Sequence, residues 1–363
     1  MSEFRIDQIT NQSGSRGPDI AGITTFTGVS GMVMPSGPTE YRGGRGRGIF
    51  AGGYTPGASP FTGTRQNTID YITIETLGNS SDFGDLTIAR TIPADAASST
   101  RGLFAGGSLN TSPSTQTNTI DYITISSTGN AFDFGDLLTT KGRSSGCSNN
   151  TRGVFMGGYL QSPTFTGYTG IEFVTISSLG NSSKFGDLFT GRYGASSCAS
   201  PTRGIFAGGG ESNPTFTGYN IIDFITISTL GNAQDFGDLL LPGGKRLLSG
   251  CSNSIRGLFA GGIESPLGSG ANNNVIEYIT IASTGDSIDF GDLTQARRFL
   301  QATANRTRGV FGGGYTPTPT AQGLNTIDYV NIMSTGNAQD FGDLTRLMNA
   351  GSALSDAHGG LGD

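Results

Sequence analysis

Apolar and polar positions follow the same pattern six times along the chain. In each copy, small polar residues precede an Arg-Gly pair, two apolar side chains and a cluster of glycines, as in RGIFAGG from Arg203. A variable polar loop follows, then an apolar segment such as IIDFITIS, a short link such as TLGN, and a closing segment such as AQDFGDL. The copies begin 51 to 54 residues apart, at Arg47, Arg101, Arg152, Arg203, Arg256 and Arg308. A period of about 50 residues indicates a blade or solenoid unit.

Each copy of the pattern predicts four short strands. The third strand is apolar at nearly every position, as in IDYITI from Ile69, which is typical of a central strand covered on both faces. Thr-Gly-Asn or Leu-Gly-Asn follows this strand in five of the six copies, and Gly or Asn supplies the positive φ of a hairpin turn. No sustained helical periodicity interrupts the pattern, so the fold class is all-β. Six four-stranded antiparallel units favour a six-bladed β-propeller over a solenoid, whose repeats are usually shorter or helical.

The C-terminal tail predicts how the ring closes. The stretch LTRLMNAGSALSDAHGGLGD continues the rhythm that follows each earlier FGDL and stops where a seventh Arg-Gly pair would begin, with His358 in that place. The first copy begins at Arg47 without a convincing first strand of its own. We therefore expect residues 350 to 356 to pair inside the first blade, because this pairing removes both open edges of the sheet.

Residues 1 to 40 precede the repeats, and we expect them to form an extended N-terminal docking arm. Their Gly, Ser, Thr and Pro content indicates a segment that becomes ordered only by docking elsewhere. The stretch ITTFTGVSGMVM has enough β-branched and apolar side chains to add a strand to a neighbouring protein, whereas the alternative is a disordered leader. Residues 41 to 363 then form the propeller domain.

Composition and charge limit the kinds of partner. The chain has 363 residues, 60 of them Gly, with 14% charged residues and no Trp, which is unusual for an ordinary enzyme domain. A net charge of -6 disfavours general affinity for nucleic acid or anionic lipid. No apolar run approaches the length of about 20 residues that spans a bilayer, and the start MSEFRIDQIT lacks the apolar core of a secretion signal. We therefore expect neither a nucleic-acid partner nor a membrane partner.

Two resemblances follow from these phrases. A strand ending in Gly-Gly, a loop and an aromatic-containing strand, at about 50 residues per unit, resemble the kelch family of β-propellers over residues 41 to 363. Kelch units usually carry a Trp after the Tyr, and here the Phe of FGD is expected to fill that packing role. RGxFAGG, IDYITI and DFGDL, with the opening FRIDQITNQSGSRGPDIAGITTFTGVSG, resemble virion structural proteins of tailed bacteriophages, particularly those that infect marine cyanobacteria. This resemblance implies a protein made in the host cytoplasm and located in the virion.

The repeated charged residues predict structural roles and no catalytic site. His358 is the only histidine, which excludes two-His metal sites and most His-activated nucleophiles, and we expect no cofactor. Paired carboxylates could suggest glycoside cleavage, but an active site breaks symmetry and these acids recur in every copy. We expect them to hold turns or to pair with the equally repeated Arg-Gly arginines. The acids are Asp70, Asp121, Glu172, Asp223, Glu277 and Asp328, then Asp85, Asp136, Asp187, Asp238, Asp292 and Asp343, and the arginines are Arg101, Arg152, Arg203, Arg256 and Arg308.

Three cysteines share one slot in consecutive repeats: Cys147, Cys198 and Cys251. We expect them to be small buried residues, because neighbouring first strands around a propeller axis are too far apart for the Cα separation of about 4.4 to 6.8 Å that a disulfide tolerates. Three cysteines without a histidine also make a poor zinc site. The sequence therefore predicts no metal at this slot.

The loops after the Gly pairs differ most between repeats, and propeller connectivity places all six on one face. Functional residues concentrate on loops carried by a rigid scaffold, and exposed aromatic rings suit sugar stacking or protein contact. The alternative is that the rings only pin the loops down. The candidate rings are Tyr54, Phe61, Tyr159, Phe165, Tyr168, Phe216, Tyr219 and Tyr315.

Two functions follow from the sequence, and neither involves enzymatic activity. The first is a virion structural protein, displayed on the head or tail and attached to other virion proteins through residues 1 to 40. The second is an adhesin, like a tail fibre, that binds a host-surface glycan or protein with the long-loop face. The two functions do not exclude each other, and both are compatible with a homo-oligomer.

Overall fold

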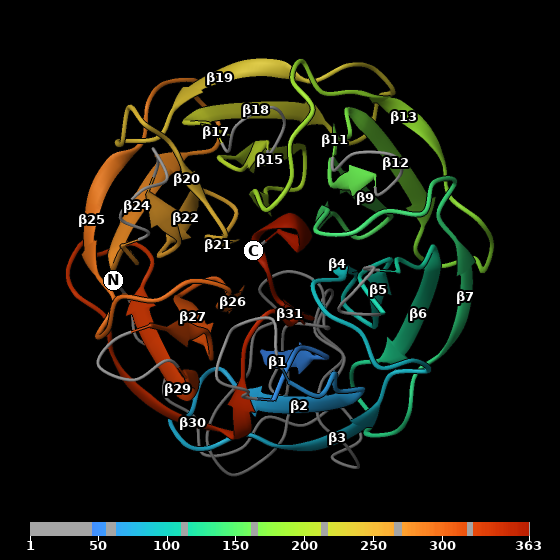
Figure 1. The fold of residues 1–363 in the computed structure, drawn as a ribbon, viewed down its shortest axis with the longest axis horizontal. Coiled ribbons are helices and arrows are strands. Elements are labelled where there is room, and N and C mark those ends of the chain that lie inside the picture. Colours follow the sequence, from blue (N-terminus) through green and yellow to red (C-terminus); the bar gives the residue numbers. More distant parts are fainter. Residues whose placement is uncertain are drawn as a thin grey trace, which may run out of the picture. The chain divides into compact units, whose positions relative to one another are not determined.

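The protein forms an all-β, six-bladed β-propeller, as the repeat pattern predicts. The computed structural model describes residues 46–55, 63–109, 115–160, 166–211, 217–264, 271–317 and 322–362. Within these ranges the strands form six four-stranded antiparallel blades arranged as a ring (Figure 1). The predicted N-terminal arm lies outside the described residues. No helix in the described ranges is long and apolar enough to cross a membrane.

Each blade runs from an innermost strand at the ring centre to an outermost strand at the rim. The innermost strands, in ring order, are β31 (Ser352–Ser355), β4 (Ala94–Ala97), β8 (Ser145–Ser148), β14 (Ser196–Ala199), β21 (Ser249–Ser252) and β26 (Gln301–Ala304). The second strands contain the Arg-Gly pairs and are β1 (Arg47–Ala51), β5 (Arg101–Ala105), β9 (Arg152–Met156), β15 (Arg203–Ala207), β22 (Arg256–Ala260) and β27 (Arg308–Gly312). We number the blades one to six in this order.

The apolar segments and the FGD segments form the outer half of each blade. The third strands are β2 (Thr68–Thr73), β6 (Thr119–Thr124), β12 (Gly170–Thr175), β18 (Ile221–Thr226), β24 (Val275–Thr280) and β29 (Gln322–Asn331). The outermost strands are β3 (Ser81–Asp85), β7 (Phe132–Asp136), β13 (Ser183–Asp187), β19 (Gln234–Asp238), β25 (Ile288–Asp292) and β30 (Gln339–Met348). Short additional strands on the long-loop face are β10 (Tyr159–Leu160), β11 (Thr166–Gly167), β16 (Gly210–Glu211), β17 (Thr217–Gly218), β20 (Lys245–Arg246), β23 (Ile263–Glu264) and β28 (Tyr315–Thr316).

The C-terminal strand closes the ring inside blade one. β31 pairs antiparallel with β1, with Ser355 opposite Gly48 and Ser352 opposite Ala51. Just beyond β31, Asp356 Oδ1 accepts hydrogen bonds from the backbone N–H groups of Gly46 and Arg47, at 2.8 and 2.9 Å. The first and last segments of the propeller are therefore joined, in the place that the sequence analysis expects.

The apolar core consists of layers between neighbouring blades. Between blades four and five, for example, Ile205 and Ile222 of one blade pack with Phe259 and Ile279 of the next. The aromatic side chains of the FGD segments are buried, and Phe236 packs edge-on against the ring of Phe224. The FGD phenylalanines thus contribute to the core, as expected in the absence of Trp.

Small residues allow the inner strands to approach the next blade closely. A Cβ atom added to Gly204 would lie 2.6 Å from the Sγ atom of Cys147, and one added to Gly257 would lie 2.5 Å from Cys198 Sγ. The three cysteines are free thiols buried against the Arg-Gly glycines of the following blade. The repeated glycine and the small residue facing it are therefore two halves of one interblade contact.

The links between the third and fourth strands form a belt around the rim. Between blades one and two, the N–H groups of Gly129 and Ala131 donate to the carbonyls of Phe83 and Asp85, both at 2.8 Å. The Asp85 N–H donates in return to Asn130 Oδ1 at 3.0 Å. The same three contacts recur at the other five junctions, with an aspartate in place of the asparagine at one of them.

The belt explains two repeated glycines and yields a prediction. Gly84 and Gly129 both have positive φ, +148° and +154°, but a Cβ at Gly84 would lie 2.4 Å from the Gly129 carbonyl oxygen, while one at Gly129 meets nothing within 4 Å. We expect Gly84→Ala to lower the free energy of unfolding by about 2 kcal/mol more than the control Gly129→Ala, because only the first forces two blades apart. Chemical denaturation of both variants measures the difference. Equal losses would show that the close approach of the blades is not required.

Candidate functional site

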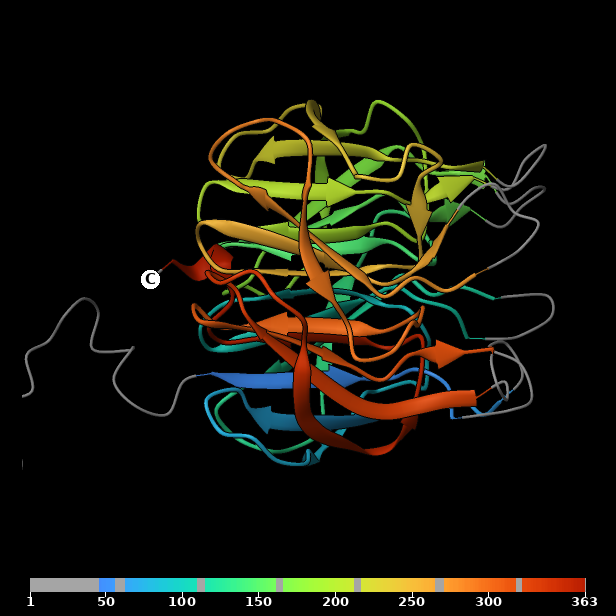
Figure 2. The same cartoon turned by 90° about the vertical axis from the view of Figure 1, so that its left-hand side faces the viewer.

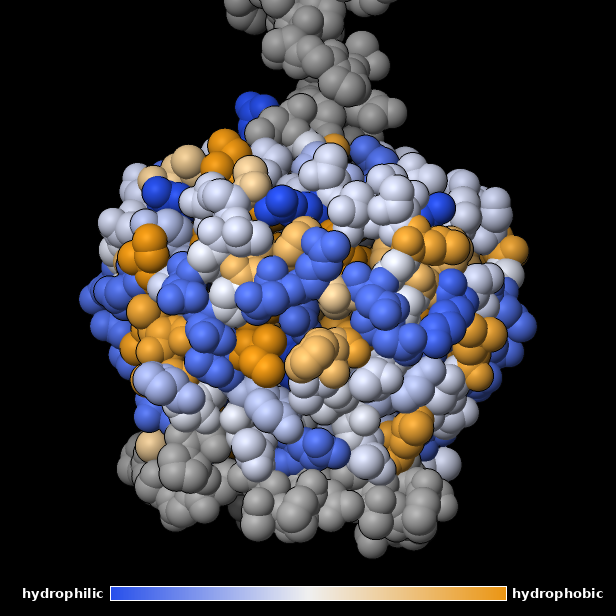
Figure 3. Space-filling model, turned by 90° about the horizontal axis from the view of Figure 1, so that it is seen from above, coloured by the Kyte–Doolittle hydropathy of each residue, from blue (hydrophilic) through white to orange (hydrophobic). Residues whose placement is uncertain are grey.

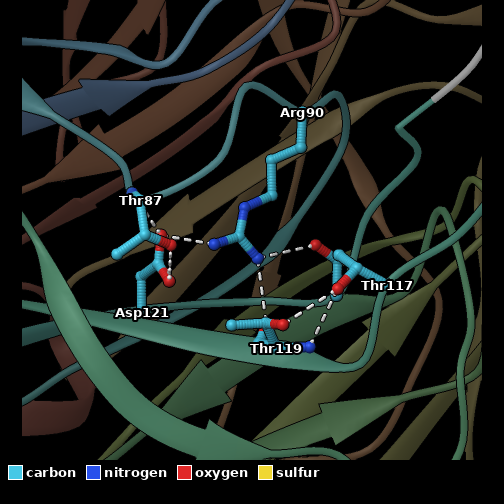
Figure 4. Close-up of polar contacts among 6 residues, drawn as sticks. Thr87, Arg90, Thr117, Thr119 and Asp121 are labelled. Carbon is cyan, nitrogen blue, oxygen red and sulfur yellow. Dashed lines mark hydrogen bonds and ion pairs between the residues drawn. The ribbon is translucent and has the colours of Figure 1, made fainter.

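The repeated acids of the third strands lie buried at the blade junctions, each beside a lysine or arginine. In blade two, Asp121 pairs with Arg90, which lies on the connection from blade one (Figure 4). Asp121 also accepts hydrogen bonds from the N–H and hydroxyl of Thr87 of blade one, at 3.0 and 2.7 Å. Arg90 donates to the backbone carbonyls of Gly106 and Thr119 at 3.1 and 2.8 Å. Each pair therefore ties a connection to the blade that it enters.

Equivalent pairs occupy the other five junctions. They are Lys141–Glu172 (3.1 Å), Arg192–Asp223 (2.9 Å), Lys245–Glu277, Arg297–Asp328 (2.9 Å) and Arg346–Asp70 (3.7 Å). Burial raises the pKa of Asp70 and Asp223 above its ordinary value, and burial lowers the pKa of Lys141 and Arg297. Because these groups are removed from water, each charge is stabilised only by its partner and by hydrogen bonds within the protein.

The predicted pairing of these acids with the Arg-Gly arginines is wrong. The Arg101 guanidinium lies 4.6 Å from the centre of the Tyr122 ring in its own blade, and its Nη1 donates to the carbonyl of Ile176 in the next blade at 2.8 Å. Arg152, Arg203, Arg256 and Arg308 make the same two contacts. The physical reason is position. These arginines begin the second strands, whereas the acids of the third strands face the connections that carry the paired cations.

The FGD aspartates contribute mainly through their backbone. Asp136, Asp187, Asp238, Asp292 and Asp343 occupy the belt position of Asp85 at the other five junctions. The carboxylate of Asp187 forms an exposed ion pair with Lys184 at 2.8 Å. An exposed pair contributes little to stability, about 0–1 kcal/mol.

The structure buries three of the eight aromatic rings that the sequence analysis assigns to an exposed binding face. Tyr54, Tyr159 and Tyr315 directly follow the Gly pairs and are 4 to 6% exposed. Each ring lies against an arginine, as Tyr315 does against Arg298 at 4.9 Å. The Gly pair turns the chain inward, so the ring that follows it enters the face of the propeller.

The remaining five rings have different outcomes. Tyr168 and Tyr219 are partly buried, and the Tyr168 hydroxyl lies 3.2 Å from the Thr139 hydroxyl. The Lys141 ammonium lies 5.2 Å from the centre of the Tyr168 ring. Phe61, Phe165 and Phe216 lie outside the described residues.

The six innermost strands line a central channel that is closed at one end. After β31 the chain crosses the end of the channel, and the 3₁₀ helix η2 (Gly359–Leu361) lies there (Figures 1 and 2). His358 Nε2 lies 3.0 Å from the Ala97 carbonyl oxygen, and burial lowers the pKa of His358 to about 4. We call residues 356 to 362 the plug. The open end of the channel lies on the opposite, long-loop face, because the inner strands begin there.

A ring of left-handed residues surrounds the open end, which we call the channel mouth. One residue from each connection into an inner strand has φ between 48° and 64°, and five of the six are not glycine. The N–H of one residue donates to the carbonyl of its neighbour around the ring, as from Leu247 to Gly194 at 2.6 Å. Large side chains in this conformation are strained. The six residues are Ile92, Arg143, Gly194, Leu247, Phe299 and Ala350.

Three arginines gather at the channel mouth. The Arg143 guanidinium lies 5.6 Å from the centres of the Tyr159 and Tyr193 rings and 5.9 Å from that of Phe299 on the opposite side of the mouth. Burial lowers the pKa of Arg246, and the nearby charges of Arg143 and Arg298 lower it further, while Tyr193 raises it. Burial also lowers the pKa of Arg298. The mouth is therefore a positively charged, partly dehydrated region.

The channel mouth opens into a cavity of about 90 Å³ whose polar groups differ between blades. Gln301 and Ser144 line it with the carboxyl group of Asp95. Burial raises the pKa of Asp95 to about 7, against hydrogen bonds from the Ser352 hydroxyl (2.8 Å) and the Ala353 backbone. The residues that the six copies share give no sign of this site, whereas Gln301 and Asp95 stand out when the copies are compared position by position.

The remainder of the described surface is a weaker candidate for a binding site. Phe132, Phe189 and Leu230 are among the exposed apolar side chains. Figure 3 shows apolar and hydrophilic residues intermixed on one side of the ring. In the part of the chain that the structure describes, no group of three His, Cys, Asp or Glu side chains is placed to hold a metal ion. The channel mouth is the best candidate for a binding site.

Comparison with protein families and with curated proteins adds no relative from which a function could be transferred. No protein-family model matches the chain, and no curated protein matches it. The function of this chain is therefore inferred from its own residues and their geometry.

The raised pKa of Asp95 predicts a pH-dependent stability. Because the folded protein binds this proton more tightly than the unfolded chain, stability from Asp95 falls as the pH rises from about 4 to about 7 and is constant above that. We expect Asp95→Asn to raise the free energy of unfolding by about 1–3 kcal/mol at pH 8, allowing for water in the channel, and to leave it nearly unchanged at about pH 4. Urea denaturation at both pH values measures this. A difference that is the same at both pH values would contradict the raised pKa.

Proposed function

We propose that the protein is a non-enzymatic structural protein of a tailed-phage virion, attached through residues 1 to 40. In this proposal a kelch-like propeller presents its long-loop face away from the particle. The observation that carries the proposal is the difference between the two faces. One face carries the plug and the start of the propeller at Gly46, and the other carries the long loops and the open channel mouth.

Two further observations support this function. The third-strand carboxylates, which recur in every blade, pair with cations at the junctions, which is a use in the scaffold rather than in catalysis. The virion assignment depends on the resemblance of RGxFAGG, IDYITI, DFGDL and the N-terminal stretch to virion structural proteins of tailed phages. Other virion proteins would be the partners of the arm.

A second function, recognition of a host-surface glycan or protein, is supported by the open face. The channel mouth combines cations, aromatic rings and hydrogen-bonding groups on the same face as the long loops. Loops and concave sites on rigid scaffolds are usual places for recognition. An adhesin of this kind would still be attached through its arm.

Deletion of residues 1 to 40 tests the attachment. We expect the shortened chain to remain folded, because every strand of the propeller lies downstream, and to be absent from assembled particles. Far-ultraviolet circular dichroism checks the fold, and quantitative mass spectrometry of purified particles measures incorporation. Full incorporation of the shortened chain would contradict the proposal.

Adsorption of assembled particles to host cells separates the two functions. Recognition by the long-loop face predicts that replacing Phe165, Tyr168, Phe216 and Tyr219 by Ser reduces adsorption. The control replaces Leu179 and Leu230 by Ser, since these are exposed apolar residues of the same blades on the links of the opposite face. Normal adsorption by both variants would contradict recognition by the long-loop face and leave the structural function as the one that is supported.

A further inference from the structure

The polar residues of the channel cavity break the sixfold symmetry of the propeller. The position equivalent to Gln301 carries serine in four other blades and Ala94 in the fifth. The position equivalent to Ser144 carries no hydroxyl group in any other blade. Asp95 takes a slot that is otherwise filled by Gly, Ser or Ala. A repeat scaffold needs the residues that its units share. The residues that differ, gathered in one cavity, are free to serve another purpose.

The side-chain amide of Gln301 points to a ligand. Gln301 is 2% exposed and lines the cavity, yet neither its Nε2 nor its Oε1 has a hydrogen-bond partner within the protein. The Ser144 hydroxyl is buried in the same cavity and is likewise unpartnered. A buried polar group without a partner is unfavourable, because it has given up its hydrogen bonds to water. The cavity thus offers donors and acceptors to hydroxyl groups or to the water molecules that such groups would replace.

The rim of the cavity selects the charge of that ligand. Arg143 lines the cavity, and Arg246 and Arg298 immediately precede the cavity-lining residues Leu247 and Phe299. The Nε of Arg298 is buried without a hydrogen-bond partner. Guanidinium groups bind carboxylates through paired, charge-assisted hydrogen bonds. Asp95 lies deeper in the channel, so a negative charge on the ligand is favoured at the rim, beside the arginines, rather than beside Asp95.

The size of the cavity limits the ligand further. A volume of about 90 Å³ holds several water molecules, since about 10–15 Å³ is enough for one. The plug closes the far end, so the ligand enters only from the long-loop face. The site therefore has room for a compact molecule or for the end of a chain, but not for an extended polymer.

We propose that the channel mouth binds a small hydroxylated carboxylate, with the carboxylate beside Arg143, Arg246 and Arg298 and the hydroxyl groups on Gln301 and Ser144. A free hydroxy acid and an acidic sugar at the end of a glycan share this chemistry. The site goes beyond the proposed virion function and does not depend on it.

Isothermal titration calorimetry of the full chain with glucuronate tests the proposal. We expect glucuronate to bind at least about tenfold more tightly than glucose, which lacks the carboxylate, and than acetate, which lacks the hydroxyl groups. Gln301→Ser introduces the residue of four other blades and is expected to weaken glucuronate binding about tenfold. The matched control Gln234→Ser, at an exposed position of β19, should leave binding unchanged.

A second pair of variants tests the rim. Arg143→Gly introduces the residue found at Gly194 and relieves a positive φ, so the variant should fold, and it should lose at least about tenfold in affinity. The control Arg306→Gln alters an exposed arginine on the opposite face and should bind normally. A glucuronate-terminated disaccharide that binds more tightly than glucuronate would identify a glycan end as the ligand, and equal or weaker binding would identify a free acid. Absence of glucuronate binding, equal binding of glucose, or unchanged binding by Gln301→Ser and Arg143→Gly would overturn the proposal.

Discussion

The buried pair of an acid and a cation at each blade junction is the interaction on which the propeller depends. Removing two charges from water is costly, and the cost is offset only when each charge meets its partner and further hydrogen bonds. At the first junction these are supplied by separate segments: Arg90 from the connection, Asp121 from the third strand of blade two, and Thr87 from the end of blade one. The pair is satisfied only when neighbouring blades are assembled, so it makes the assembly specific as well as stable.

The rim belt and the interblade glycines complete the same junction. The belt bonds are backbone contacts that depend on glycines able to approach each other, and the Arg-Gly glycine leaves space for the small residue of the preceding inner strand. The residues that recur in all six blades form these contacts. The residues without sixfold repetition, such as Gln301 and Asp95, are therefore the ones left to distinguish the channel mouth from the rest of the ring.

The sequence predicts the fold well because the signals are local and repeated. Strand periodicity, the Gly-Asn links and the extra inner strand at the C-terminus specify the blades and the closure without knowledge of contacts. The partners of the charged residues could not be predicted in this way. The cation that pairs with Asp121 is Arg90 rather than Arg101. Both arginines lie close to Asp121 along the chain, and only the packing of the two blades decides which of them forms the pair.

The candidate site shows the same limit. Tyr54 and Tyr315 belong to variable loops, and their sequence gives no sign that the Gly pair before them directs the ring inward. The channel cavity is formed by residues of all six inner strands and their connections, brought together only by closure of the ring. A side chain such as Gln301 becomes notable when its five counterparts are seen around it.

A double-mutant cycle at the first junction tests the role of the buried pairs most directly. The free energy of unfolding would be measured for Asp121→Asn, Arg90→Met and the double variant. We expect each single change to cost about 3–5 kcal/mol, because it leaves one buried charge without its partner, and the double variant to lose less than the sum by at least about 2 kcal/mol. Additive losses, within about 0.5 kcal/mol, would contradict the account, because they would mean that the two charges do not depend on each other.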